Sequence, residues 1–352
     1  MKRLITVFTL MVCLCLVFTA CVNNNPTQNP DNLGDELQSE QTDINSDNEN
    51  NVPVNPIVVN VASLKGPTSM GLVKLIDDYT ENADPEYAYN FAIEAAGDAI
   101  SPKLIKGELD IAAVPANLAS VLYNKTNGGV VVLNINTLGV LYIVENGETV
   151  TSVSDLKGKT IYASGKGNTP EYALNYMLTA NGLVPGKDVF VEFKSEHAEC
   201  VAAISTTENS VAMLPQPFAT TAQMTDSNIR IALNINDEWE KASGKTLVTG
   251  VTVARKEFVE NNPELISKFL ADYKASADYA NTNISEAAAL IEKYGIFKAA
   301  VAEKAIPFCQ ITCIDGADMK APLADYLTIL SEQNAASIGG KLPADDFYYN
   351  AQ

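Results

Sequence analysis

Four short segments of the sequence carry residues of the kinds that bind small polar ligands in α/β proteins. Each follows an apolar β-type run and precedes a helical pattern, and they are residues 65–70, 115–117, 165–170 and 215–218. Open α/β sheets bind their ligands beyond the carboxyl ends of the strands. Three of the segments contain Ser, Thr or Asn, and the N–H groups at a helix start can bind a carboxylate or a sulfonate. The same residue types are common N-caps, so it is the convergence of the segments that predicts a ligand site.

The remaining composition argues against catalysis and against a highly charged ligand. His197 is the only His, which argues against His-based metal sites, Ser-His-Asp triads and most acid-base chemistry. The stretch at residues 165–169 lacks the spacing of a nucleotide phosphate loop. The only Arg residues are Arg3, Arg230 and Arg255, too few to expect a bidentate clamp on an anion. We predict no enzyme, no metal site and no cofactor, and a ligand that is neutral, zwitterionic or singly anionic.

The charge of the chain decides which macromolecules are expected as partners. Lys and Arg total 24 against 43 Asp and Glu, so the formal net charge of the 352 residues is -19. Nucleic acids are bound through Lys and Arg on the protein surface. We therefore expect no nucleic-acid partner.

The first 56 residues are expected to be an export signal and a tether. Lys2 and Arg3 precede an apolar run over residues 4–18, and small residues then precede Cys21. This is the pattern of a secretory signal, and the run is short for a membrane span. Residues 22–56 are rich in Asn, contain no Lys or Arg and lack periodic apolar positions. We predict a signal peptide at residues 1–21 and a disordered linker at residues 22–56.

His197 and the cysteines of the remaining chain form no pattern that is specific for a site. His197 follows Glu196 and precedes Cys200, but adjacent residues of a helix point in different directions, so we predict a solvated helix start rather than a metal cluster. Cys200, Cys309 and Cys313 are an odd set of three. We expect small buried side chains, with one disulfide or a metal site as the alternatives.

Alternating β-type and helical runs predict an α/β architecture with largely parallel sheets. The predicted strands, of which 130–144 is one long or broken strand, are residues 57–62, 110–114, 130–144, 160–164, 189–193, 210–214 and 229–235. From residue 262 onward the pattern is mainly helical, with an interruption near residues 306–314. Two successive β-α series exceed one small core, so we predict two lobes.

Apolar contacts for a ligand are expected from aromatic residues close to the four segments. Tyr142, Tyr172 and Phe218 are the first candidates, and Trp239, the only Trp, is the next. Each of them can instead belong to the hydrophobic core, and the pattern does not separate the two roles.

Several motifs, in this order along the chain, resemble those of the solute-binding lipoproteins of ABC importers. They are Gly-Pro-Thr-Ser-Met-Gly at residues 66–71, Gly-Glu-Leu-Asp-Ile-Ala at 107–112, Asp-Leu-Lys-Gly-Lys at 155–159, Met-Leu-Pro-Gln-Pro-Phe-Ala-Thr at 213–220 and Val-Ala-Arg-Lys-Glu-Phe at 253–258. The small residues before Cys21 resemble a bacterial lipobox, with an uncleaved anchor or a coincidental Cys as the alternatives. The most similar branch is the nitrate, sulfonate, taurine and thiamine-pyrimidine type of periplasmic-binding protein, and the resemblance covers nearly all of residues 57–352.

The resemblance implies a two-lobed periplasmic-binding-protein (type II) α/β fold with a hinge of two crossing strands. The crossings are expected near residues 137–141 and 247–251, so that residues 57–139 and 248–352 form lobe 1 and residues 140–247 form lobe 2. The implied function is extracytoplasmic capture of a small organic solute between the lobes for delivery to an ABC permease and its ATPase. The implied protein is a monomer that Cys21 anchors through a lipid to the bacterial cell membrane.

The implied ligand site lies in the cleft between the lobes. With Tyr142 added as an aromatic candidate, the residues expected to contact the ligand are Gly66, Pro67, Thr68, Ser69, Met70, Asn117, Thr137, Tyr142, Gly165, Lys166, Asn168, Thr169, Pro215, Gln216 and Phe218. Two other classes of function remain as alternatives. One is an enzyme on the same scaffold that acts on a small heterocycle, with a carboxylate such as Glu171 as its base. The other is a sensory or adhesive surface lipoprotein.

Overall fold

The computed structural model of the protein describes residues 56–82 and 84–350. The predicted signal peptide, Cys21 and nearly all of the predicted linker lie outside these ranges. The chain from residue 56 onward belongs to one compact unit. Within the described ranges, no helix has the length and apolar character needed to cross a membrane.

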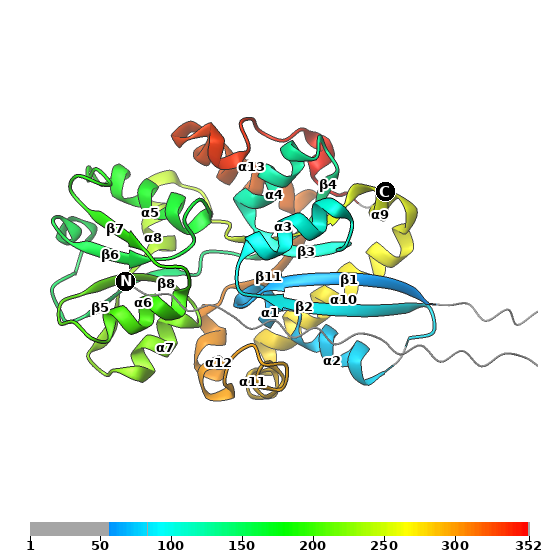
Figure 1. Ribbon diagram of the computed structural model, residues 1–352, viewed down its shortest axis with the longest axis horizontal. Helices are drawn as coiled ribbons and strands as arrows, with labels where there is room; N and C mark the ends of the chain where they lie inside the picture. Colours follow the sequence, from blue (N-terminus) through cyan, green and yellow to red (C-terminus); the bar gives the residue numbers. More distant parts are fainter. Residues whose placement is uncertain (1–55, 83, 351–352) are drawn as a thin grey trace, which may run out of the picture. The chain divides into compact units, whose positions relative to one another are not determined.

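A six-stranded sheet organises what we call the first half of this unit (Figure 1). Its strand order is β11-β4-β10-β3-β1-β2. The strands are β1 (Ile57–Leu64), β2 (Tyr87–Glu94), β3 (Ile111–Pro115), β4 (Val130–Thr137), β10 (Gly250–Arg255) and β11 (Ile311–Asp315). β1 is parallel to β2 and β3, whereas β10 is antiparallel to β3 and β4, and β11 is antiparallel to β4.

Helices cover both faces of this sheet because its strands carry apolar residues on both sides. Val130 and Val132 of β4 face one hydrophobic cluster, and the alternate residues Val131 and Leu133 face another. α3 (Gly97–Lys106), α4 (Ala116–Lys125) and α13 (Gly316–Gln333) contribute to the first cluster, and α2 (Val73–Glu81) and α10 (Pro263–Thr282) to the second. The remaining elements of this half are α1 (Pro67–Met70), α9 (Lys256–Asn261), α11 (Ile284–Lys293), α12 (Ala299–Ala305) and the 3-10 turns η2 (Ile306–Phe308), η3 (Ala335–Ile338) and η4 (Asp345–Phe347).

A five-stranded sheet of order β7-β6-β8-β5-β9 organises the second half, drawn mostly in green in Figure 1. Its strands are β5 (Leu141–Asn146), β6 (Thr160–Ala163), β7 (Phe190–Phe193), β8 (Val211–Pro215) and β9 (Ile229–Asn234). β6 is parallel to β7 and β8, and β5 is antiparallel to β8 and β9. Its other elements are η1 (Val153–Leu156), α5 (Thr169–Ala180), α6 (His197–Ile204), α7 (Phe218–Thr225) and α8 (Ile235–Ser243).

Two segments of the chain connect the sheets. Residues 138–140 lead from β4 to β5, and residues 244–249 lead from α8 to β10. Thr249 holds the two segments together, because its N–H donates to the carbonyl of Thr137 (3.1 Å) and its hydroxyl donates to the carbonyl of Leu138 (2.5 Å). The connections overlap the ranges in which the resemblance implies the crossing strands.

One hydrophobic cluster runs through both halves. It includes Ile135 of β4 and Ile143 of β5, which lie in different sheets, and also Trp239 of α8 and Tyr326 of α13. These last two rings are fully buried, with their centroids 5.7 Å apart. The halves are therefore packed together along one side as well as connected by the two segments.

The predicted α/β class is confirmed, but the expectation of largely parallel sheets is wrong. Both sheets are mixed, and the antiparallel strands include β5 and β10, the strands that follow the two connections. Parallel neighbours need a long crossover, usually helical. Each of the two short connections leads directly into a strand of the other sheet, β5 or β10. That strand runs antiparallel to its neighbours.

Two strands are missing from the sequence-based prediction. β2 is an edge strand of moderate burial, and β10 is a buried strand between β3 and β4. The predicted long strand at residues 130–144 is broken into β4 and β5. The interruption expected near residues 306–314 contains η2 and β11.

Candidate ligand-binding site

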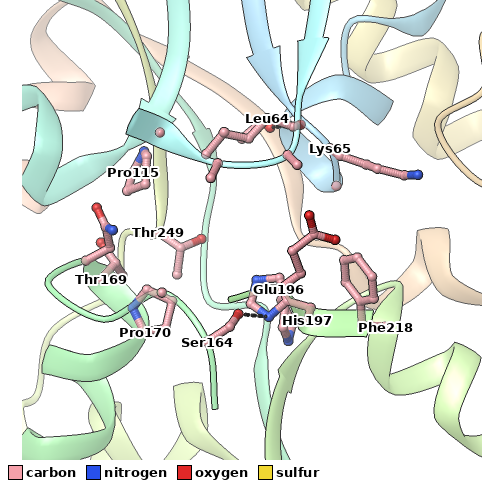
Figure 2. A pocket seen from close by; sticks show the side chains of 18 of the residues that line it. Leu64, Lys65, Pro115, Ser164, Thr169, Pro170, Glu196, His197, Phe218 and Thr249 are labelled. Atoms are coloured by element: carbon pink, nitrogen blue, oxygen red, sulfur yellow. Dashed lines mark hydrogen bonds between the residues drawn. The ribbon is translucent and has the colours of Figure 1, made fainter. Parts of the chain in front are cut away.

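A cavity of about 430 Å³ lies between the two halves (Figure 2). The first half contributes the loops that follow β1 and β2 and the last residue of β3, and the second half contributes the loops that follow β6 and β7, the last residue of β8 and the first residue of α7. Thr249 and Val140, from the two connecting segments, also line it. The carboxyl ends of strands from both sheets thus meet at one cavity, as ligand sites of α/β proteins require.

Most of the residues expected to contact a ligand line this cavity. They are Gly66, Pro67, Thr68, Gly165, Lys166, Asn168, Thr169, Pro215 and Phe218. In Figure 2, Thr169 and Pro170 lie on one side of the cavity and Phe218 on the other. All of them follow a predicted strand, which is the signal that located them.

The remaining candidates are not brought to the cavity, and they are Ser69, Met70, Asn117, Thr137, Tyr142 and Gln216. Ser69 and Met70 lie in the single turn of α1 and point inward. The hydroxyl of Ser69 bonds Ser63 Oγ (2.7 Å) and the carbonyl of Leu64 (2.5 Å), and Met70 belongs to the hydrophobic core.

Thr137, Tyr142 and Gln216 are buried polar residues with partners inside the protein. Thr137 Oγ1 donates to Asn136 Oδ1 (2.9 Å), and the hydroxyl of Tyr142 donates to the carbonyl of Phe308 (3.2 Å). The side-chain oxygen of Gln216 accepts from Thr220 Oγ1 (2.8 Å) at the start of α7. These bonds hold the Thr137 and Tyr142 side chains away from the cavity, whereas Gln216 is held through its oxygen alone and its buried Nε2 has no hydrogen-bond partner among the described residues.

Sequence reasoning missed several parts of the lining. One is the loop at residues 95–98, which follows the unpredicted strand β2. The alternation of Tyr87, Tyr89, Phe91 and Ile93 along β2 is the signal that could have found this strand and hence the loop. A second is the loop at residues 194–198. Phe297, from the segment before α12, has no strand ahead of it and carries no comparable signal.

Two helices begin at the cavity with their first N–H groups free of a side-chain cap. Gly97 and Asp98 of α3 and His197 and Ala198 of α6 line the cavity, and neither helix has a capping hydrogen bond from its N-cap residue. The first turn of a helix carries unsatisfied N–H groups and the positive end of the helix dipole. The cavity wall therefore offers hydrogen-bond donors to an anionic group.

The predicted helix start is confirmed, because α6 begins at His197 between exposed neighbours, but the His197 ring itself is half-buried in the cavity wall. Its Nδ1 lies 2.6 Å from the hydroxyl oxygen of Ser164, a buried residue at the end of β6 (Figure 2). Its ring lies against Phe218, with centroids 5.0 Å apart. Burial lowers the pKa of His197 to about 4, so the imidazole is neutral at pH 7. A neutral imidazole and a hydroxyl add hydrogen-bonding groups without adding charge.

The charges around the cavity are mixed. Lys65, Lys166 and Lys194 line it together with Asp98 and Glu196. The ammonium of Lys194 forms an ion pair with Glu192 outside the cavity lining (2.6 Å). With Lys194 paired to Glu192, Lys65 and Lys166 balance Asp98 and Glu196, so the lining has no positive excess that would favour a ligand with two or three negative charges.

Neither Arg of the described chain serves the cavity. Arg230 pairs with Glu145 (2.7 Å) and Arg255 pairs with Asp110 (2.6 Å), each beside its own sheet. The composition predicts no bidentate Arg clamp on a ligand. This cavity lining contains no Arg.

One side of the cavity is an aromatic wall built from both halves. Phe218 of α7 and Phe297 meet edge to face, with ring centroids 5.1 Å apart and planes at 79°. The ammonium of Lys65 lies 5.5 Å from the Phe297 ring. Of the other aromatic candidates, Tyr142 and Trp239 belong to the core and Tyr172 packs against it. An apolar part of a ligand would be in contact with the Phe218 and Phe297 rings.

Among the described residues, the cysteines, the possible metal ligands and Glu171 are not arranged for the chemistries that the sequence left open. Cys200, Cys309 and Cys313 are free thiols, and the described residues contain no group of side chains placed to hold a metal ion. Glu171, the carboxylate considered as a base, accepts a hydrogen bond from the N–H of Gly167 (2.6 Å) and does not line the cavity.

Comparisons with known proteins agree with this geometry. Residues 86–304, more than half of the chain, match the family model described as ABC transporter, phosphonate, periplasmic substrate-binding protein. No curated protein matches the sequence.

Solved structures share the fold over most of the chain. An ABC transporter protein from Parabacteroides distasonis is 25% identical, with a TM-score of 0.69 over 84% of this chain and 99% of its own. The periplasmic aliphatic sulphonate binding protein SsuA from Escherichia coli is 16% identical, with a TM-score of 0.69 over 84% of this chain and 93% of its own. The alkanesulfonate-binding protein SsuA from Xanthomonas axonopodis pv. citri, bound to MOPS, is 14% identical, with a TM-score of 0.65 over 82% and 96%.

The two sheets with a cavity between them, the match over residues 86–304 and the shared fold lead to one assignment. The chain belongs to the family of phosphonate-type periplasmic substrate-binding proteins of ABC transporters, and it is the extracytoplasmic solute-binding component of an import system of this type.

Proposed function

We propose that the cavity binds a small organic solute that carries one oxyanion head group, a sulfonate or a singly charged phosphonate. The observation that carries this proposal is the start of α6. There, uncapped N–H groups, the neutral imidazole of His197 and the hydroxyl of Ser164 line one part of the cavity. One proton of the neutral His197–Ser164 pair lies in the hydrogen bond between them, so the head-group oxygens could be bonded by the one remaining proton of the pair, on Nε2 or on the hydroxyl, and by the N–H groups of α6.

The charge balance supports a monoanion. Asp98 and Glu196 also line the cavity and would repel a second negative charge. A sulfonate carries one negative charge at neutral pH, whereas a phosphonate carries up to two. Two solved relatives with the same fold are named as sulfonate-binding proteins, which is in keeping with this class of ligand.

Capture would occur by closure of two lobes on the solute. We assign residues 57–139 and 248–352 to lobe 1 and residues 140–247 to lobe 2, with the two connecting segments as the hinge. The predicted residues that line the cavity would contact the ligand, and the buried ones would support them. A lipid on Cys21 and the linker at residues 22–56 would hold the monomer near its permease and ATPase, which bind the closed form.

The test is calorimetric titration with linear alkanesulfonates, the matching phosphonates and carboxylates, and neutral sulfonamides. We expect sulfonates to bind and sulfonamides of equal length to fail, because only the former carry the charge that the helix start attracts. The proposal is abandoned if neutral and anionic compounds of equal length bind equally well, or if none of them binds.

A matched pair of variants locates the head group. Ala198 lines the cavity in the first turn of α6, and Ala202 lies one turn further on, exposed and outside the lining. Ala198→Glu places a carboxylate beside the bound oxyanion, and like charges about 4 Å apart cost about 1–4 kcal/mol between water and a protein surface. The Kd of the sulfonate should rise at least about tenfold in Ala198→Glu. Ala202→Glu should leave it unchanged.

A further inference from the structure

A chain of buried polar side chains joins the two halves beside the cavity. Asn117 opens α4 in the first half, and Thr169 opens α5 in the second half. Asn117 Oδ1 accepts hydrogen bonds from the N–H (3.0 Å) and the hydroxyl (3.2 Å) of Thr169. The Thr169 hydroxyl in turn accepts a hydrogen bond from the hydroxyl of Tyr326 in α13 (2.8 Å).

The amide of Asn117 is used fully in this arrangement. Its Nδ2 donates to the carbonyl of Gly167 (3.3 Å) and to the carbonyl of Ser337 in η3 (3.0 Å). Asn117 and Thr169 are each 1% exposed, and Tyr326 is fully buried. Four hydrogen bonds fix the position of this buried amide, because the loss of any one of them would leave a buried polar group without a hydrogen-bond partner.

The segment that Asn117 holds is part of the cavity wall, although Asn117 itself is not. Gly165, Lys166, Asn168 and Thr169 line the cavity. Asn117 bonds Gly167 and Thr169 within that segment from the opposite half. It therefore fixes the position of the loop relative to the first half rather than contacting the ligand.

We propose that Asn117 is the positioning residue of the ligand site, acting with Thr169 and Tyr326 as a latch between the halves. The latch bonds can form only when the two halves are in contact. They thus favour the closed arrangement in which both halves reach one ligand. The ligand in this inference is taken from the proposed function, whereas the hydrogen bonds of the latch do not depend on that proposal.

The effect on affinity follows from the population of the closed state. When the binding-competent state is only partly populated, the apparent Kd rises in inverse proportion to its fraction. Removing the Asn117 amide is expected to raise the Kd for an alkanesulfonate about tenfold, which corresponds to about 1.4 kcal/mol. The dissociation rate should rise by a similar factor, because the halves separate more readily.

α4 supplies a matched control for this residue. Asn124 lies two turns further along α4 and also donates its side-chain amide to the C-terminal segment, at the carbonyls of Ile338 (2.9 Å) and Lys341 (2.8 Å). It makes no hydrogen bond to the second half in the described structure. Asn124→Ala removes contacts within the first half alone, whereas Asn117→Ala also removes the bonds between the halves.

The experiment has one readout with ligand and one without. Calorimetry of Asn117→Ala, Asn124→Ala and the wild type gives the Kd for the best-binding alkanesulfonate. Hydrogen exchange of the Thr169 amide, which donates to Asn117, measures the latch in the ligand-free protein. Tyr326→Phe, which keeps the ring and loses only its hydroxyl, repeats both measurements with less risk to folding.

We expect faster Thr169 exchange and a Kd about tenfold higher in Asn117→Ala, a smaller shift of the same sign in Tyr326→Phe, and a Kd within twofold of wild type in Asn124→Ala. Equal Kd values for Asn117→Ala and Asn124→Ala would overturn the positioning role. Unchanged Thr169 exchange in Asn117→Ala would overturn the latch, whether or not a ligand is known. Absence of binding in the wild type would instead refute the proposed ligand class, and the exchange result would then decide on the latch alone.

Discussion

At the residue scale, the only His of the chain gives an unusually clean probe of the cavity. The ring of His197 is packed against Phe218 and bonded to Ser164, and its pKa is lowered to about 4 by burial. A proton NMR titration of the imidazole contains a single His signal and should give a midpoint well below the usual 6.5. A midpoint near 6.5 would mean that the ring is solvated.

The same lowered pKa makes the stability of the protein depend on pH. Between about pH 4 and pH 6.5 the unfolded chain binds a proton at His197 that the folded protein does not bind, so stability falls as pH falls through this window. His197→Gln should remove this contribution, about 1–2 kcal/mol for a partly exposed ring. Urea unfolding of both proteins at pH 7 and pH 4.5 measures it. If His197→Gln lost as much stability as the wild type between pH 7 and pH 4.5, the pH dependence would arise from carboxylates and not from His197.

Phe297 gives a second prediction, on the apolar part of the ligand. Its ring meets Phe218 in the cavity wall, whereas Phe308, 52% exposed, lies outside the lining. Phe297→Ala should weaken binding of hexanesulfonate about tenfold and of methanesulfonate by less, because each buried CH₂ contributes about 0.8 kcal/mol. Calorimetry with both ligands on Phe297→Ala and Phe308→Ala checks this. Equal losses of affinity for the two ligands would show that the aromatic wall does not contact the alkyl chain of the ligand.

Which side chains reach the cavity was predictable only in part. Gly66, Pro67 and Thr68 were located because they follow a clear strand, but the next residue, Ser69, turns inward. The direction of a side chain in a single helical turn is set by packing, here by Ser63 and the carbonyl of Leu64. Asn117 was selected for its type and place, and its role depends on Thr169 more than 50 residues away, which the sequence pattern does not contain.

At the element scale, the strands with clear apolar runs were predicted, whereas the half-buried edge strand β2 was missed despite its alternation and β10 was missed as well. β4 is buried along its whole length and was evident from its Val-rich start, although its end was not. β10 is the strand by which the chain re-enters the first half, and it is defined by its pairing with β3 and β4. Such long-range pairing has no local signature.

Gly250, where β10 begins, is predicted to accept no larger residue. A methyl group there would lie 2.5 Å from Asn136 Oδ1 and 3.0 Å from Thr68 Cγ2. Gly250→Ala should lower the free energy of unfolding by about 1–3 kcal/mol through overpacking. Gly295→Ala, where a methyl group meets no atom within 4 Å but the backbone is left-handed at φ +69°, should cost only about 1 kcal/mol. Urea denaturation compares them, and a smaller loss in Gly250→Ala would contradict the packing described here.

At the scale of the whole molecule, the shared core predicts that the halves do not unfold independently. Ile135 and Ile143 come from different sheets, and Trp239 and Tyr326 pack across the same boundary in one cluster. Differential scanning calorimetry of the ligand-free protein should give one transition, with calorimetric and van't Hoff enthalpies in agreement. Two resolved transitions would show that the boundary is weaker than this packing implies.

The central claim is that an oxyanion head group binds at the start of α6, between the two sheets. A crystal structure of the protein with ethanesulfonate tests it most directly. The account predicts sulfonate oxygens within hydrogen-bonding distance of the first N–H groups of α6 and of one donor of the His197–Ser164 pair, the imidazole Nε2 or the Ser164 hydroxyl. A sulfonate bound outside this cavity, or one whose ethyl group points to α6 while its oxygens face Phe218 and Phe297, would contradict it.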